Sequence, residues 1–201
     1  FYGENLGLIN EFKSLIKEKN KENSIIRFTQ DELLKNNELL FNEIKNDSLF
    51  QEEKVFLIDQ TDDKIYNLIE EISKIIKGQK IFLFSENLEK RSKLRNFFEK
   101  GKDLAIVACY QDNEIGIRKL IQKKLKNFKG MTPDNINIIL NNSNLERSKL
   151  QNELDKIVMY FQDKNLDTEK LEELLNIKIN DDFNKLKDKA LIGDKNKTNE
   201  L

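Results

Sequence analysis

Four short apolar runs in the first half of the chain constrain its fold more than any other feature. They are rich in β-branched and aromatic residues and are too short for typical helices. Each run is apolar throughout, as in strands of a parallel sheet that is covered on both faces. The predicted strands are 25–28, 55–58, 81–84 and 104–108, and residues 1–2 are expected to end one more strand.

Amphipathic stretches separate these runs and predict helices. Thr29 and Glu32 form a capping-box pattern that opens a helix extending to about residue 44. Apolar residues recur at helical spacing in 61–77, and 91–100 forms another predicted helix. Alternation of strands and helices implies right-handed crossovers. The predicted fold class is therefore α/β, a parallel sheet flanked by helices.

The strand pattern ends at Cys109, and the rest of the chain predicts helices up to about residue 175. We expect an α/β domain over 1–109, a small all-helical lid domain over 110–178, and the start of a linker over 179–201. An α/β sheet followed by a helical lid is the layout of AAA-type nucleotide-driven proteins. A phosphate loop is therefore the first feature to seek.

The loop at the start of the chain lacks the residues of a functional phosphate loop. If Gly3 is the first glycine of a Gly-x-x-x-x-Gly-Lys-Ser/Thr motif, then Leu8, Ile9 and Asn10 occupy the positions of the second glycine, the lysine and the hydroxyl. Isoleucine cannot supply the charge that a phosphate needs. The sequence therefore predicts a degenerate loop that binds no nucleotide and no other cofactor.

The strand at 55–58 ends in Asp59, as a Walker B strand does, but the next residue is Gln60. An active ATPase would keep a glutamate there to polarise water. Asp59 is expected to be a turn residue or a relic of such a site. We therefore predict that the chain is not an enzyme by itself.

Composition excludes several other classes of function. The chain has no histidine and a single cysteine, so triad hydrolases, zinc sites and disulfide frameworks are poor candidates, and no metal is expected. The 35 basic and 36 acidic residues nearly balance, unlike those of a dedicated nucleic-acid binder. No apolar run approaches the roughly 18 residues of a membrane helix. A reducing, cytoplasmic location is expected.

Ser48, Leu49 and Phe50 form a candidate binding element. Two interpretations are open: Leu49 and Phe50 pack beneath the sheet, or they form an exposed apolar anchor for a partner. Polar residues on both sides, 45–48 and 51–54, favour the second interpretation.

The basic run around residue 90 also has two interpretations. Lys90, Arg91, Lys93 and Arg95 either form a solvated helix face or contact DNA or another phosphate group. A solvated face is the more common outcome for such a run.

Five stretches, in this order along the chain, resemble the delta subunit of the bacterial DNA polymerase III clamp loader. They are a degenerate phosphate-loop region at 2–11, a clamp-binding element at 48–50, a stretch after the fourth strand at 87–95, a domain junction at 109–112, and a lid-helix motif, Glu-x-x-Lys-x-x-x-Tyr, at 153–160. The resemblance runs from about residue 1 to 195.

The resemblance implies a role in DNA replication. Delta subunits bind the ring-shaped β sliding clamp and open it, and the corresponding apolar pair here is Leu49 and Phe50, after Ser48. They assemble with other clamp-loader subunits, partly through a C-terminal helical collar that this sequence does not contain. They reach primer–template DNA through the assembled loader and carry no ATP. The alternatives are an active AAA-type ATPase and a loader subunit of the gamma or delta-prime type, which usually carries a cysteine-rich zinc module.

Overall fold

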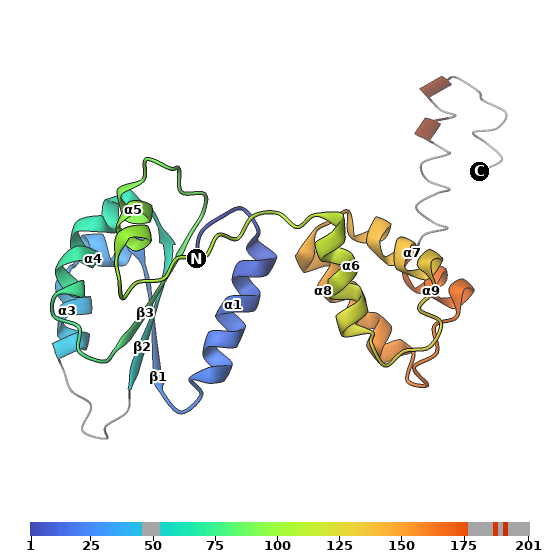
Figure 1. The fold of residues 1–201 in the computed structure, drawn as a ribbon, viewed down its shortest axis with the longest axis horizontal. Coiled ribbons are helices and arrows are strands. Elements are labelled where there is room, and N and C mark those ends of the chain that lie inside the picture. Colours follow the sequence, from blue (N-terminus) through green and yellow to red (C-terminus); the bar gives the residue numbers. More distant parts are fainter. Residues whose placement is uncertain (46–52, 177–186, 189–190, 193–201) are drawn as a thin grey trace. The chain divides into compact units, whose positions relative to one another are not determined.

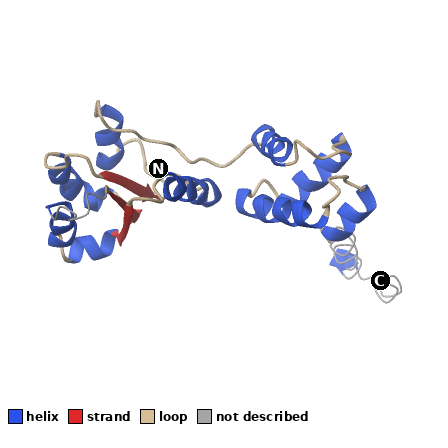
Figure 2. Ribbon diagram, turned by 90° about the horizontal axis from the view of Figure 1, so that it is seen from below, coloured by secondary structure: helices blue, strands red, loops and turns tan. Residues whose placement is uncertain are grey.

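The computed structural model describes residues 1–45, 53–176, 187–188 and 191–192. The chain divides into two compact units, Phe1–Gln111 and Asp112–Leu201. The first contains strands and helices, whereas the regular structure described in the second is helical (Figures 1 and 2). The division after Gln111 lies close to the boundary expected after Cys109. The lid and linker assignments stay predictions.

A three-stranded parallel sheet forms the centre of the first unit. Its strands are β1 (Ser24–Thr29), β2 (Lys54–Thr61) and β3 (Lys80–Ser85), in the order β1-β2-β3. Ile26 pairs with Phe56, which pairs with Ile81 on the other side. Three of the predicted strands and the α/β class with a helix-flanked parallel sheet are thereby confirmed.

The fourth predicted strand is wrong as a strand of this sheet. Of residues 104–108, only Ala108 takes part in a bridge, and its parallel partner is Tyr2. Tyr2 also bridges to Ser85 at the end of β3, so Phe1 and Tyr2 lie between β3 and the 104–108 segment. The apolar content of residues 104–108 predicts an extended segment. A ladder of strand hydrogen bonds also needs a neighbouring strand of similar length, and here the neighbouring segment contributes one bridged residue, Tyr2.

Helices cover both faces of the sheet, as the continuous burial of residues 55–58 in β2 requires (Figure 1). On one face, α1 (Leu6–Lys19) packs Ile9 and Ile16 against Val55 and Leu57. Sequence patterns did not predict this helix. The opposite face of β2, Phe56 and Ile58, is covered by α2 (Gln30–Lys35), α3 (Glu38–Lys45), the 3₁₀ helix η1 (Asp63–Ile65), α4 (Tyr66–Ser73) and α5 (Lys93–Lys100).

The helix expected over 29–44 is two helices, because Asn36 interrupts it. Asn36 is extended, with φ −144° and ψ 90°, and its Oδ1 accepts the N–H of Glu38 at the start of α3. The capping box is confirmed: Glu32 Oε2 accepts the N–H of Thr29 at 2.7 Å, and Thr29 Oγ1 accepts the N–H of Glu32. The hydrogen bonds from Thr29 lower the pKa of the Glu32 carboxyl.

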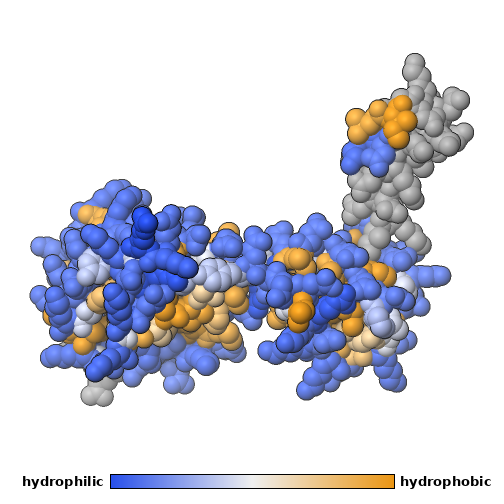
Figure 3. Space-filling model, turned by 45° about the horizontal axis from the view of Figure 1, so that its top comes forward, coloured by the Kyte–Doolittle hydropathy of each residue, from blue (hydrophilic) through white to orange (hydrophobic). Residues whose placement is uncertain are grey.

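Four helices pack around one apolar core within residues 112–176 of the second unit. They are α6 (Glu114–Lys124), α7 (Pro133–Ser143), α8 (Arg147–Tyr160) and α9 (Thr168–Leu174). Ile117, Ile139 and Leu150 are fully buried at their centre. Figure 3 shows a mainly hydrophilic surface with scattered hydrophobic side chains. None of the helices in the described ranges has the length and apolar character needed to cross a membrane.

Candidate functional site

Gly3 lies where the chain enters α1, and the backbone of the 104–110 segment explains why it is glycine. Its φ is +138°, and a Cβ placed on it would lie 2.2 Å from the carbonyl oxygen of Cys109. The adjacent strand-like pairing holds this approach, since Tyr2 donates to Val107 O and Cys109 donates to Tyr2 O. The glycine therefore serves close chain packing in this structure.

The amino end of α1 is capped by the protein itself. Asn5 is buried, and its Oδ1 accepts the N–H of Leu8 at 3.0 Å while its Nδ2 donates to the carbonyl of Tyr110 at 3.1 Å. Ile9, at the position of the phosphate-loop lysine, is only 4% exposed and packs in the core beneath α1. Asn10, at the hydroxyl position, is exposed.

Lys13 was not singled out from the sequence, yet it is the cation nearest to Asp59. Its Nζ lies 2.5 Å from Asp59 Oδ1 and 4.7 Å from the centroid of the Phe84 ring. Both side chains of the ion pair are about two-thirds shielded from solvent or more, at 25% and 32% exposed. Asp59 lies within β2 rather than in a turn, and its charge is already balanced from within the chain.

The signal that identifies Lys13 is helical spacing. Lys13 follows Ile9 by one turn of α1, so it lies on nearly the same face of the helix as the degenerate lysine position. Because the sequence patterns predicted no helix over residues 6–19, the shared helix face of Ile9 and Lys13 could not be recognised from the sequence.

Gln60 interrupts the regular pairing of β2 with β3. Its φ is +58°, in the left-handed region that favours glycine, and the register between the two strands shifts between Ile58 and Thr61. Beyond the irregularity, Thr61 and Ser85 face each other with their hydroxyl oxygens 2.6 Å apart. This bulge turns Gln60 outward, where its side chain is exposed.

These features give the carboxyl end of the sheet little capacity for phosphate chemistry. Groups of the chain itself thus occupy the positions where the predicted phosphate-loop alignment would put a nucleotide: Asn5 caps α1, Lys13 pairs with Asp59, and Ile9 is buried. Within the described ranges, no cluster of three or more histidine, cysteine or carboxylate residues could hold a metal ion.

The basic run begins at the amino end of α5, and a carboxylate already occupies that helix end. Asp63 accepts hydrogen bonds from Ser92 Oγ at 2.5 Å and from the N–H groups of Lys93 and Leu94 at 3.1 and 3.0 Å. The side chains of Lys90, Arg91 and Lys93 are exposed around it. Phosphate contact here would therefore depend on the lysine and arginine side chains rather than on free backbone N–H groups.

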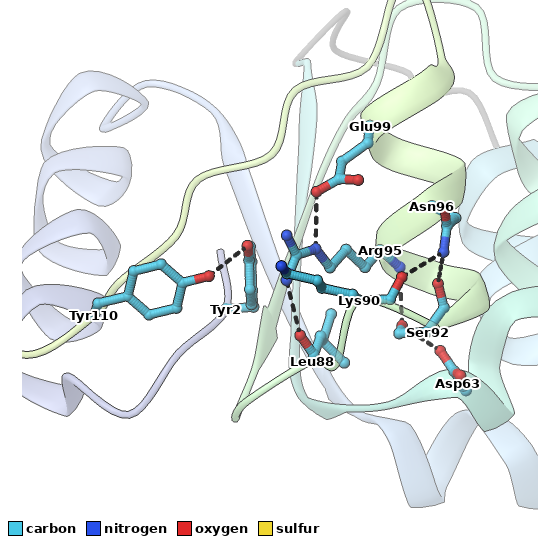
Figure 4. A network of polar contacts seen from close by, with 9 residues as sticks. All are labelled: Tyr2, Asp63, Leu88, Lys90, Ser92, Arg95, Asn96, Glu99 and Tyr110. Atoms are coloured by element: carbon cyan, nitrogen blue, oxygen red, sulfur yellow. Dashed lines mark hydrogen bonds and ion pairs between the residues drawn. The ribbon is translucent and has the colours of Figure 1, made fainter.

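Arg95 differs from the other three basic residues, because its guanidinium is engaged inside the first unit (Figure 4). It donates to Glu99 at 2.8 Å and to the carbonyl of Leu88 at 3.2 Å, and it lies 5.0 Å from the centroid of the Tyr2 ring. The hydrogen bond to Glu99 raises the pKa of Arg95. Tyr2 in turn pairs with the hydroxyl of Tyr110 at 3.0 Å.

Replacing Asp63 by asparagine is expected to destabilise the first unit by about 1 kcal/mol at neutral pH, the usual scale for a charged helix cap. Partial burial acts to raise the pKa of Asp63, but the hydrogen bonds from Ser92, Leu94 and Lys93 outweigh it and lower the pKa. The ionised carboxylate therefore stabilises the fold above its ordinary pKa of about 3.9, and that contribution disappears as the pH falls through the lowered value.

Urea unfolding of the wild type and the Asp63→Asn variant across this range checks the prediction. Their difference should be largest above about pH 5 and should shrink below about pH 3. Glu86→Gln, at an exposed position in the same unit, should show no such pH-dependent difference. A constant difference at every pH would contradict the assigned role of the charge.

The predicted clamp-binding residues Ser48, Leu49 and Phe50 lie outside the described residues. Helix α3 ends at Lys45 before them, and β2 starts at Lys54 after them. Their predicted role as an exposed anchor stays a prediction.

Comparison with solved structures identifies a similar chain. The Bacillus subtilis DNA clamp loader delta protein (YqeN) superposes with a TM-score of 0.65 at 15% sequence identity, and the likeness covers 99% of the chain described here. The two proteins share a fold. At this identity, the likeness to the delta protein establishes the fold and leaves function to be proposed.

The chain spans 64% of the length of the delta protein chain in that structure. No protein-family model matches the chain, and no curated protein matches it significantly.

Proposed function

We propose that the chain is a delta-type clamp-loader subunit that binds a ring-shaped β sliding clamp and favours its open form. The observation that carries the proposal is the likeness in fold to the clamp loader delta protein over 99% of the chain. The ordered sequence motifs also support it. They include the region of the degenerate phosphate loop, and they include the apolar pair Leu49 and Phe50, which corresponds to the clamp-contacting pair of delta subunits.

The proposed mechanism is differential affinity. A protein that binds the open ring more tightly than the closed ring shifts the equilibrium by that difference and needs no chemistry of its own. The subunit is thus non-catalytic, and it works beside other loader subunits that bind ATP. Ile9 in the core and the Lys13–Asp59 ion pair support this division of labour, since they leave the chain without a phosphate-binding lysine at the usual position.

Primer–template DNA is proposed to reach this subunit through the assembled loader. Lys90, Arg91 and Lys93 are the candidates for phosphate contact, because their side chains are exposed. Arg95 is a weaker candidate, because Glu99 and the carbonyl of Leu88 already engage its guanidinium.

Calorimetric titration of the chain with the cognate β sliding clamp tests the proposal, and we expect saturable binding. A parallel melting experiment with Mg²⁺ and ATP discriminates the ATPase alternative. The melting temperature should stay unchanged if the chain binds no ATP. A bound nucleotide at 100 times its dissociation constant would instead stabilise the protein by about 2.7 kcal/mol and raise its melting temperature. Absence of clamp binding, or a melting shift with ATP, would reject the proposed function.

A further inference from the structure

The longest stretch of the chain without a carboxylate lies near the start of the second unit. No aspartate or glutamate occurs between Glu114 and Asp134. The same stretch contains six basic residues, Arg118, Lys119, Lys123, Lys124, Lys126 and Lys129. A block of one charge either forms a solvated face or binds a polyanion. The positions of these side chains in the fold decide between the two.

Three of the lysines lie on the side of α6 that points away from the core. Ile117 and Ile121 are fully buried, in the core that α6 shares with α7 and α8. At about 3.6 residues per turn, Lys119 and Lys123 lie one turn apart on the opposite side of the helix. Lys126 follows one turn later, just beyond the helix end, and all three side chains are exposed. These three residues form the lysine row.

Internal ion pairs of the second unit leave the lysine row without a counter-charge. Arg118 donates to Glu114 Oε1 at 2.8 Å, and Lys124 Nζ lies 2.9 Å from Asp155 Oδ1. In the part of the chain that the structure describes, no ion pair involves a member of the lysine row. The carboxylates beside α6 are thus already paired, and the row is available to an outside anion.

A second chain segment adds charge at the end of the row. Lys129 donates its N–H to Lys164 O at 2.8 Å and accepts the N–H of Leu166 at 3.0 Å. The side chains of both lysines are exposed. Asp163 stays within its own turn, where its Oδ1 accepts the N–H of Asn165 at 3.1 Å. Lys129 and Lys164 therefore extend the row with two cations from segments that are distant in the sequence.

We propose that the lysine row, extended by Lys129 and Lys164, binds the phosphate backbone of double-stranded DNA without reading its sequence. Duplex DNA carries one negative charge per roughly 1.7 Å of its axis. Lysines one helical turn apart, about 6 Å along α6, can each meet a phosphate without any fit to base edges. This surface belongs to a different unit from Lys90, Arg91 and Lys93, to which the proposed function assigns DNA contact. The inference stands on charge and exposure and does not depend on clamp binding.

The chemistry of α6 favours duplex DNA over other polyanions. A helix that lies in a membrane surface needs an apolar face beside its lysines, but Ile117 and Ile121 are used by the core and Ile115 is the one fully exposed apolar residue of α6. Single strands stack on exposed aromatic side chains, and α6 contains none. Lysine is also depleted in protein–protein interfaces, which favour aromatic residues and arginine.

The test is fluorescence anisotropy of a labelled duplex of mixed sequence, titrated with the chain at several salt concentrations. The Lys119→Gln, Lys123→Gln, Lys126→Gln variant should bind at least about tenfold more weakly at about 0.1 M salt. The slope of log affinity against log salt should become shallower by about 2.7, because each of three phosphate contacts contributes about 0.9. Melting curves establish that the variant is folded.

Two further variants control for total charge and for folding. Lys74, Lys77 and Lys102 are exposed in the first unit, so their replacement by glutamine removes the same charge elsewhere. That variant should bind within about twofold of the wild type. Gln122 is exposed beside the lysine row, and Gln122→Lys should steepen the salt slope by about 0.9. This gain keeps the proposal testable even if the triple variant unfolds.

An unchanged affinity and salt slope after the α6 substitutions would overturn the proposal. Loss of binding only after replacement of Lys90, Arg91 and Lys93 by glutamine would assign DNA to the first unit and overturn it as well. Tighter binding of a single strand than of the duplex would reject the duplex as ligand. Sedimentation with phosphatidylserine vesicles, without duplex binding, would assign the row to a membrane surface. Calorimetry with the clamp reports on the proposed function separately, so the two proposals fail independently.

Discussion

Simultaneous replacement of Leu49 and Phe50 by alanine is expected to weaken binding of the β sliding clamp by at least about 100-fold, a loss of roughly 3 kcal/mol. Two apolar side chains docked in a pocket contribute on the order of 3–6 kcal/mol by burial, and such anchors dominate binding energies. The measurement is calorimetric titration of the clamp with the variant and with the wild type. Melting curves of both proteins establish that the loss lies in binding.

A matched control comes from the same unit. Leu34 and Leu39 are 38% and 39% exposed on α2 and α3, so their replacement by alanine removes two apolar side chains of similar chemistry. Clamp binding should persist in that variant within about threefold, since surface substitutions away from a contact change energies little. Full binding by the Leu49→Ala, Phe50→Ala variant would refute the proposed grip while leaving clamp binding itself intact.

Replacing Gly3 by alanine is expected to destabilise the first unit by about 3 kcal/mol or more. The backbone at φ +138° is almost confined to glycine, which costs another residue about 1–3 kcal/mol. The added Cβ also meets Cys109 O at 2.2 Å, and relief of that overlap must displace the chain that pairs with Tyr2. We expect the melting temperature of the unit to fall by more than about 10 °C.

Gly78 provides the control for Gly3, because a Cβ there meets no atom within 4 Å and its φ is not positive. The Gly78→Ala variant should unfold within about 0.5 kcal/mol of the wild type. Similar stability of the two variants would mean that the close approach of Cys109 does not hold in solution.

Sequence patterns predicted the parts of the fold that burial controls. The runs ending at Phe28, Ile58 and Phe84 form the three strands, because uninterrupted apolar character is required of strands covered on both faces. The Thr29–Glu32 capping box and the amphipathic helices followed from local chemistry. These signals are short in range and need no knowledge of the partner segment.

Features that depend on distant segments were not predictable. Residues 104–108 have strand composition but pair only at Ala108, because pairing depends on how much chain lies beside them. Helix α1 and the approach of Lys13 to Asp59 were not predicted, because the glycines at positions 3 and 7 indicate a loop rather than a helix. The hydrogen bond from Arg95 to the carbonyl of Leu88 likewise depends on how α5 folds back on the 86–92 loop, whereas the pair of Arg95 with Glu99 is a local contact within α5.

The packing beneath α1 opposes the stepwise gain of a phosphate-binding lysine. A lysine introduced at position 9 would enter an apolar core where Ile9 is 4% exposed, at a cost of several kcal/mol. Replacing Lys13 by an uncharged residue would leave the partly shielded carboxylate of Asp59 without its cation. Each single step toward nucleotide binding thus passes through a destabilised protein. The packing of Ile9 and the Lys13–Asp59 ion pair therefore both oppose the gain of a nucleotide site.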